Sequence, residues 1–187
     1  MAEITKSPGT MADDATVGYI AWTNPNNAKV SDDSYATADC YGTHYLKATN
    51  FGFSVPTGAT INGITAEFET KYISGTENVY YGIVKIVKAD GTIGSTNRGG
   101  NEALTWSYVA DHYDLFGANN DLWGEIWTAE DINNYNFGVV ITGNDPGDGS
   151  GSAVGGVDHI RITVYYTPAA STLSNISSIS NIQSITF

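Results

Sequence analysis

The sequence lacks the paired cysteines typical of small secreted domains and the basic runs typical of nucleic-acid-binding proteins. It contains a single cysteine, Cys40, which excludes an internal disulfide. Small secreted domains more often carry paired cysteines, so this count favours folding in a reducing compartment. Only eight basic residues oppose twenty acidic ones, giving a formal net charge of −12, and the basic residues form no run. A chain with this charge repels nucleic-acid phosphates, so we expect no nucleic-acid partner.

Long apolar runs are also missing. No stretch approaches the roughly 20 apolar residues of a membrane span, so we expect no membrane partner. Residues 1–10 contain no basic region followed by an apolar run, and we therefore expect no signal peptide. The chain has 187 residues, a length that suits one domain with appendages.

Motifs for catalysis or metal binding are absent as well. His44, His112 and His159 share no metal-ligand spacing, and Cys40 has no partner cysteine. No Gly-x-Ser-x-Gly elbow is present, and residues 147–151 fit neither dinucleotide nor P-loop spacing. Acidic residues are plentiful, which leaves a carboxylate pair for glycoside hydrolysis open, although no pair stands out. We expect a protein without enzymatic activity, cofactor or metal.

One loop leaves a metal alternative open. Residues 143–156 are rich in glycine and aspartate, and residues 144–149 faintly resemble a calcium loop. The ligand spacing of an EF-hand and its closing glutamate are missing. A flexible, soluble loop is therefore the favoured interpretation, and the sequence does not decide whether calcium binds.

Short alternating segments separated by turn residues dominate the rest of the chain. In residues 50–72 a turn at 56–58 precedes a clean alternation in which Ile64, Ala66 and Phe68 share one face. Further extended runs are predicted at residues 16–22, 35–40, 43–48, 78–88, 104–108, 137–142 and 160–166, with one short helix at 128–133 capped by a threonine. This pattern predicts an all-β antiparallel β-sandwich of jelly-roll type, with one short helix and an extended C-terminal tail. We expect an irregular N-terminal arm over residues 1–15, the sandwich over 16–168, and a linker with an isoleucine-rich assembly tail over 169–187.

The tail has a period that fits neither a strand nor an α-helix. Five apolar residues recur at every third position between polar residues: Leu173, Ile176, Ile179, Ile182 and Ile185. An extended helix with three residues per turn would place all five on one stripe. A disordered tail is the alternative, but disordered segments seldom contain so many β-branched apolar residues. We predict that these residues order on assembly, either around an axis of three copies or in a partner's groove.

Two tyrosines are candidates for a ligand or interface site. Neighbouring residues of a strand face opposite ways, and the flanking patterns place Tyr81 and Tyr165 on the outward side of their strands. Outward tyrosines stack on sugars or fill subunit interfaces, where tyrosine is enriched. They are equally common as ordinary strand formers, and that alternative stays open. Trp106, Trp123 and Trp127 are expected in the core.

Five segments of the sequence together resemble a known group of proteins. These are residues 51–64, 121–124, 127–133, 137–139 and 157–167. The set resembles β-sandwich domains of tailed-phage virion proteins and related bacterial surface proteins, over about residues 16–167. The resemblance implies a structural or adhesive role and brings no active site with it. Because no signal peptide is expected, it favours the phage version, assembled in the host cytoplasm.

The sequence therefore leads to two functional hypotheses of different classes, with a glycoside-active enzyme as a weaker third. The first is a non-enzymatic virion component, such as a capsid decoration protein, head fibre or tail-associated domain, that docks or oligomerises through its tail. Its partners would be further copies of itself, for instance in a homotrimer, and other virion proteins. The second is a carbohydrate-binding module or adhesin that uses Tyr81 and Tyr165 to bind a glycan of a host.

Overall fold

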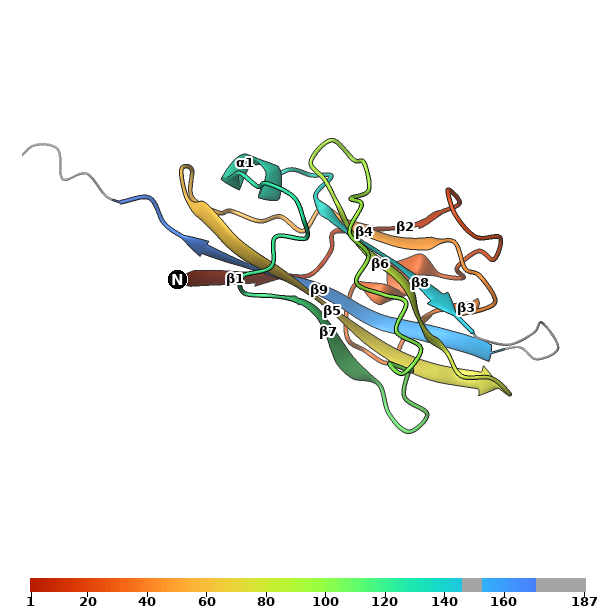
Figure 1. Cartoon of the computed structure of the whole chain (residues 1–187). Helices are drawn as coiled ribbons and strands as arrows, with labels where there is room; N and C mark the ends of the chain where they lie inside the picture. Colours follow the sequence, from red (N-terminus) through yellow and green to blue (C-terminus); the bar gives the residue numbers. More distant parts are fainter. Residues whose placement is uncertain (146–152, 171–187) are drawn as a thin grey trace, which may run out of the picture.

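The fold is a β-sandwich in which every strand lies in the opposite sheet from the strand before it. A computed structural model describes residues 1–145 and 153–170. Sheet A contains β1, β3, β5, β7 and β9, and sheet B contains β2, β4, β6 and β8 (Figure 1). The elements are β1 (Ala2–Lys6), β2 (Thr10–Asp14), the 3-10 helix η1 (Pro25–Ala28), β3 (Ala36–Asp39), β4 (Tyr45–Thr49), β5 (Thr60–Gly75), β6 (Tyr80–Val87), β7 (His112–Ala118), α1 (Ala129–Ile132), β8 (Gly138–Asn144) and β9 (Ala153–Thr167).

The strand order is that of a jelly roll, which confirms the predicted fold class. In sheet A the order is β3–β9–β5–β7, and in sheet B it is β4–β8–β6, with all pairs antiparallel. The eighth jelly-roll strand is replaced by a segment that follows the edge of β6 without forming a strand. In this segment the Arg98 amide donates to the Val84 carbonyl at 2.9 Å, and the Trp106 amide donates to Val79 at 2.8 Å. The segment protects an edge that would otherwise present unpaired backbone groups.

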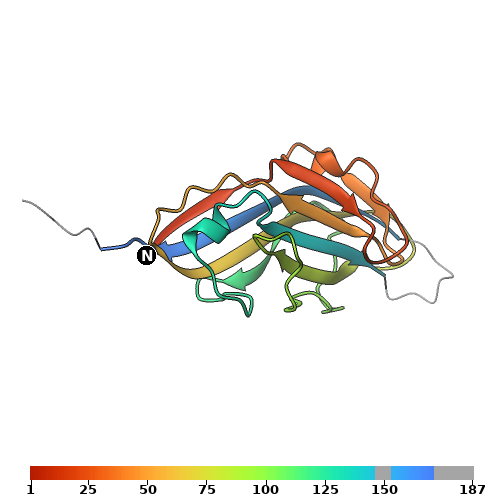
Figure 2. The same cartoon turned by 90° about the horizontal axis from the view of Figure 1, so that it is seen from above.

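The prediction of an irregular arm over residues 1–15 is wrong. β1 pairs with the C-terminal half of β9, from Ala2 opposite Tyr166 to Lys6 opposite Ile162, and β2 pairs with β4. Each therefore extends one sheet, and the turn between them carries the chain across the sandwich (Figures 1 and 2). The sequence signal is weak because both strands lie at edges and are only half buried.

Other local predictions also differ from the structure. Residues 16–22 form no strand and contribute only an isolated bridge, between Ile20 and Thr43, and residues 104–108 likewise contribute only a bridge, between Thr105 and Tyr80. β7 was missed, because its inward face carries Asp114 beside Phe116 and so breaks the apolar alternation. The short helix is confirmed, and Asp131 completes a capping box with Thr128 despite being an aspartate.

The core fills the space between the two sheets. Its largest fully buried side chains include Trp106 and Trp123, and Trp127 is 9% exposed, so the prediction that these tryptophans lie in the core is confirmed. Further inward residues come from both sheets: Leu46, Ile64, Phe68, Ile86, Phe116, Ile141, Ile160 and Ile162. Among the residues that the structure describes, no helix is long and apolar enough to cross a membrane.

A hydrogen-bonded link joins the two sheets through this core. Tyr81 of β6 donates from its hydroxyl to Asp114 Oδ2 of β7 at 2.7 Å, and its oxygen lies 2.7 Å from Thr70 Oγ1 of β5. The Tyr81 side chain is only 1% exposed, and burial raises its pKa well above the usual value. The hydroxyl therefore remains a donor, and it compensates a carboxylate that is itself 9% exposed.

We predict that Tyr81→Phe destabilises the fold by about 1–3 kcal/mol, because it leaves Asp114 buried without its strongest donor. Urea denaturation measures this loss as a lower free energy of unfolding. Tyr165→Phe is the matched control, since it removes a partly exposed hydroxyl and should change stability by less than about 0.5 kcal/mol. Equal losses in the two variants would contradict a structural role for the buried hydroxyl.

Candidate functional site

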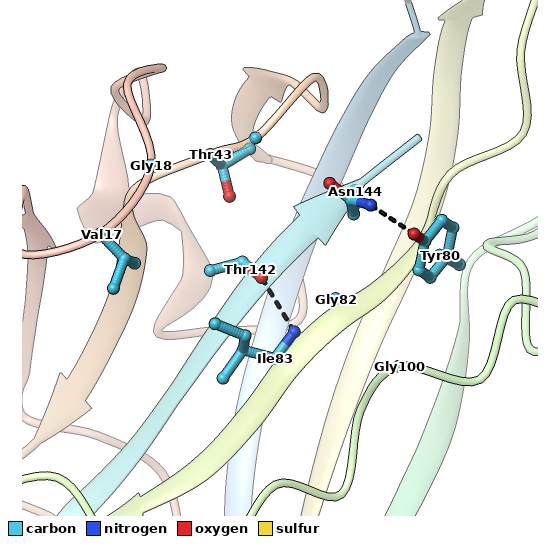
Figure 3. Close-up of a pocket in the computed structure, with 10 residues that line it drawn as sticks. Val17, Gly18, Thr43, Tyr80, Gly82, Ile83, Gly100, Thr142 and Asn144 are labelled. Atoms are coloured by element: carbon cyan, nitrogen blue, oxygen red, sulfur yellow. Dashed lines mark hydrogen bonds between the residues drawn. The ribbon is translucent and has the colours of Figure 1, made fainter. Parts of the chain in front are cut away.

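A groove of about 310 Å³ lies on the outer face of sheet B, between two loops (Figure 3). β6 and β8 form its floor. One wall comes from the loop after β2 and the turn before β4, and the other comes from the segment that follows β6. Its lining residues are Val17, Gly18, Gly42, Thr43, Tyr80, Gly82, Ile83, Gly100, Thr142 and Asn144.

A β-bulge at Gly82 shapes the floor. Tyr80 lies opposite Asn144 and Ile83 lies opposite Thr142, so Gly82 is an extra residue between two outward-facing pairs. The Ile83 amide donates to Thr142 Oγ1 at 2.9 Å. A Cβ at Gly82 would lie 2.9 Å from that same oxygen and 3.0 Å from the Asn144 Cβ. Only glycine leaves this part of the floor open.

The same bulge explains why the prediction for Tyr81 is wrong. One extra residue reverses the alternation of a strand, so the side chains before Gly82 face opposite to the sequence pattern. Tyr81 points into the core. Tyr80 lines the groove on the outer face instead, where Figure 3 shows its hydroxyl next to Asn144. The second predicted tyrosine, Tyr165, is partly exposed and faces outward on sheet A, beside Glu3 of β1. The structure does not bring the two predicted tyrosines together.

Glycine backbone forms much of the groove's walls. Gly18 and Gly42 have φ values of 65° and 80°, and a Cβ at Gly18 would lie 2.2 Å from the Thr43 carbonyl oxygen. On the other wall, Gly100 has a φ of 86° and donates its amide to the Tyr81 carbonyl at 2.6 Å. These conformations and close approaches require glycine. The walls are consequently low and present backbone rather than side chains.

The polar groups of the groove are held in place by each other and by the backbone. Thr43 Oγ1 donates to the Gly143 carbonyl at 3.3 Å and accepts from the Gly143 amide at 3.1 Å. Asn144 Nδ2 donates to the Tyr80 hydroxyl. None of the ten lining residues carries a charge. The groove therefore offers fixed hydroxyl and amide groups on an uncharged surface.

Two exposed tyrosines stand next to the glycine wall. Tyr19 follows Gly18 and Tyr41 precedes Gly42, and their side chains are 64% and 40% exposed. The ring centroids lie 5.9 Å apart at an interplanar angle of 63°, an edge-to-face pair. Partial desolvation, with smaller contributions from Tyr41 and Asp145, raises the pKa of the Tyr19 phenol, which stays protonated at neutral pH. The pair adds exposed ring faces to the polar floor.

A small apolar cluster fixes the first wall to the sheet. Tyr45, Val87 and Val140 are buried on the outer face of sheet B, and Val17 and Ile83 pack against them. Val17 thereby anchors the loop that carries Gly18 and Tyr19. The position of the wall thus depends on packing rather than on the loop alone.

A separate polar cluster lies on sheet A. One carboxylate oxygen from each of Asp33, Asp111 and Asp158 lies within 4.8 Å of the others, an arrangement that suits a cation. Asp158 accepts from the Asp32 and Asp33 amides at 3.1 and 3.2 Å, and Tyr35 donates to Asp111 at 2.8 Å. Burial raises the pKa of Asp158 despite these donors. Sequence analysis missed this cluster because its members come from three distant segments.

His159 is held by two hydroxyl groups next to this cluster. Its Nε2 lies 2.8 Å from Ser7 Oγ, and its Nδ1 lies 2.7 Å from the Tyr113 hydroxyl. Burial lowers its pKa, opposed by the charge of Glu69. The other two histidines pair with carboxylates elsewhere, His44 with Asp13 and His112 with Asp114. Each of the three histidines thus has its own partners, and the structure does not bring them together in one site.

Some predicted residues fall outside the described part of the chain. The assembly residues Leu173, Ile176, Ile179, Ile182 and Ile185 all lie in residues 171–187. Residues 146–152, half of the glycine- and aspartate-rich loop, also lie outside the described residues, and the rest of that loop belongs mainly to the ends of β8 and β9. The assembly role of the tail and the calcium alternative for the loop therefore stay predictions.

Comparisons with known proteins do not identify the chain. No protein-family model matches it, and no curated protein matches it. Among solved structures, it is similar to the CBM22-1 xylan-binding domain of Xyn10C from Paenibacillus barcinonensis. The TM-score is 0.41 at 10% sequence identity, over 86% of this chain and 92% of that domain. A likeness at this level says nothing about what this chain binds.

We predict that His159 makes stability depend on pH. The unfolded ring gains a proton as pH falls through its usual pKa of 6.5, whereas the buried ring, whose pKa is lowered by burial, gains it only at a lower pH. The unfolded state then binds more protons, so the free energy of unfolding decreases as pH falls below about 6.5. Urea denaturation at pH 7 and pH 5.5 should show a smaller decrease for His159→Gln than for the wild type. An identical decrease in both proteins would assign the pH dependence to other groups.

Proposed function

We propose that this protein is a non-catalytic binding module that holds a neutral glycan in the groove of sheet B. The observation that carries the proposal is the groove's lining, which combines fixed hydroxyl and amide groups with no charge and is flanked by the exposed rings of Tyr19 and Tyr41. The carbohydrate-binding alternative from the sequence is thus kept, but with different residues.

The chemistry of a sugar fits both parts of this surface. A pyranose ring presents C–H groups on its faces and hydroxyl groups around its edge. The faces suit the exposed rings of Tyr19 and Tyr41, whose π-systems are negative above the ring plane. The hydroxyl groups suit the amide of the half-buried Asn144, together with the small exposed parts of Tyr80 and Thr142, which are 7% and 6% exposed.

The charge of the protein favours a neutral ligand. The chain has a net charge of −12, so an acidic polysaccharide would be repelled at long range. No arginine or lysine lines the groove to offset that repulsion. We therefore expect binding of neutral chains and not of polyanions such as polygalacturonate.

The lining also supports a role without catalysis. Glycoside hydrolysis generally needs two carboxyl groups on either side of the scissile bond, about 5–9.5 Å apart. None of the ten lining residues carries a carboxyl group. A glycan in this groove would be held without a general acid or a nucleophile.

The virion role expected from the resemblance in sequence stays a prediction. A β-sandwich serves equally as a decoration domain and as a glycan-binding domain, so the fold does not separate them. The tail on which the docking hypothesis depends lies outside the described residues. An adhesive module at the surface of a particle or a cell is compatible with the proposed groove.

Affinity electrophoresis in gels containing xylan, mixed-linkage glucan or galactomannan tests the proposal. At least one neutral polysaccharide should retard the wild type, and Tyr19→Ala/Tyr41→Ala should lose most of this retardation because it removes both exposed rings. Tyr135→Ala is the matched control. The Tyr135 side chain is 59% exposed, and its hydroxyl is hydrogen-bonded to Thr10 at the start of β2, away from the groove lining. Polygalacturonate should retard none of the three proteins.

Two results would overturn the proposal. One is equal retardation of the double variant and the wild type, which would place any glycan elsewhere on the surface. The other is the release of reducing ends from a retarding polysaccharide by purified protein, which would restore the enzymatic hypothesis.

A further inference from the structure

A second groove lies between α1 with the loop before it and the start of β5. Figures 1 and 2 show these elements at one end of the sandwich. Its volume is about 400 Å³. We refer to it as the β5–α1 groove. Its lining is mainly apolar, with Glu130 as its one charged residue: Gly58, Ala59, Thr60, Ile61, Leu122, Ile126, Trp127, Thr128, Ala129 and Glu130.

The groove contains an apolar side chain that no described residue covers. Ile126 is 93% exposed, although its neighbour Trp127 is 9% exposed and packs edge-to-face on Phe137 at 5.3 Å. The Trp127 indole donates to the Leu122 carbonyl at 2.9 Å, which holds this loop in place. Ile126 is therefore presented by a fixed loop at the edge of an apolar hollow, as in a binding surface.

The described end of the chain reaches this groove. Thr167, the last residue of β9, pairs with Thr60, the first residue of β5. Two residues further on, the Ala169 Cβ lies 3.5 Å from the position that a Cβ would occupy on Gly58, which lines the groove. The chain thus leaves the sandwich at the rim of the β5–α1 groove.

The residues that follow have the composition and the reach to fill it. Residues 171–187 contain no acidic or basic side chain, and their first apolar residues are Leu173 and Ile176. An extended chain spans at most about 3.3–3.6 Å per residue, so Leu173 lies within roughly 14 Å of Ala169. Tethering at such a short distance corresponds to an effective concentration in the millimolar range. A weak apolar contact would be well populated under these conditions.

We propose that the β5–α1 groove is the docking site for the chain's own residues 173–176, with Leu173 and Ile176 covering Ile126. This assigns the first part of the tail to an intramolecular contact, and only the later isoleucines remain available for the assembly expected from the sequence. Docking of the tail from a second copy is the alternative that the experiment separates.

Disulfide cross-linking in the full-length chain tests this proposal. The variant Ile126→Cys/Leu173→Cys should form an intramolecular disulfide under mild copper-catalysed air oxidation, seen as a faster-migrating monomer on a non-reducing gel. A disulfide requires the two Cβ atoms to approach to about 3.5–4.5 Å. The native Cys40 is fully buried and is present in every variant, so it does not distinguish them.

The control variant Glu3→Cys/Leu173→Cys places the first thiol on an exposed residue of β1 that lies opposite Tyr165, within reach of the same tether but outside the groove. It should form the intramolecular disulfide several-fold more slowly. Equal rates in the two variants would mean that the tail has no preferred site, and the proposal would fail. Cross-linked dimers that increase with protein concentration would assign the groove to a second copy and also overturn it. Neither outcome bears on glycan binding, which uses the other groove.

Discussion

The antiparallel pairing of β5 with β9 is the constraint on which the rest of the structure depends. These are the two longest strands, of 16 and 15 residues, and they lie side by side along the whole molecule (Figure 1). At one end, Thr60 opposite Thr167 brings the end of β9 to the start of β5. In the middle, a register shift leaves Asp158 as an extra residue in a bulge. Its carboxylate accepts hydrogen bonds from the backbone amides of Asp32 and Asp33, in the segment before β3. Sheet B is joined to β5 of this pair through the buried hydroxyl of Tyr81, which lies 2.7 Å from Thr70 Oγ1 and donates to Asp114 of the neighbouring β7.

The sequence was sufficient for the fold class because most strands show period-two alternation between turn residues. β5 and the second half of β9 alternate cleanly in sequence, since one face carries apolar core residues and the other carries mainly polar residues that are half-buried. β1 and β2 escaped prediction because edge strands need few apolar residues. Tyr81 was misplaced because β6 is apolar on both faces, so the pattern gave no sign that Gly82 inserts a bulge and reverses it.

The candidate site was far less predictable than the fold. Its walls consist of the backbone of glycines at positions 18, 42 and 100, which come from three separate segments and carry no side-chain signal. Glycines that line a groove have the same sequence pattern as glycines in ordinary turns. Tyr80 is the partial exception. The sequence singled out the Tyr80–Tyr81 pair as carrying one outward ring, and the structure turns the other member outward.

The central claim is that a neutral glycan binds in the groove of sheet B, and mapping the bound sugar on the protein tests it most directly. In two-dimensional ¹⁵N–¹H NMR spectra, titration with a soluble neutral oligosaccharide should shift the backbone amides of Gly18, Gly42, Gly82 and Gly100, all of which line the groove. The Tyr165 amide, on sheet A, should stay in place. Shifts confined to sheet A, or no shifts across a panel of neutral oligosaccharides, would contradict the account.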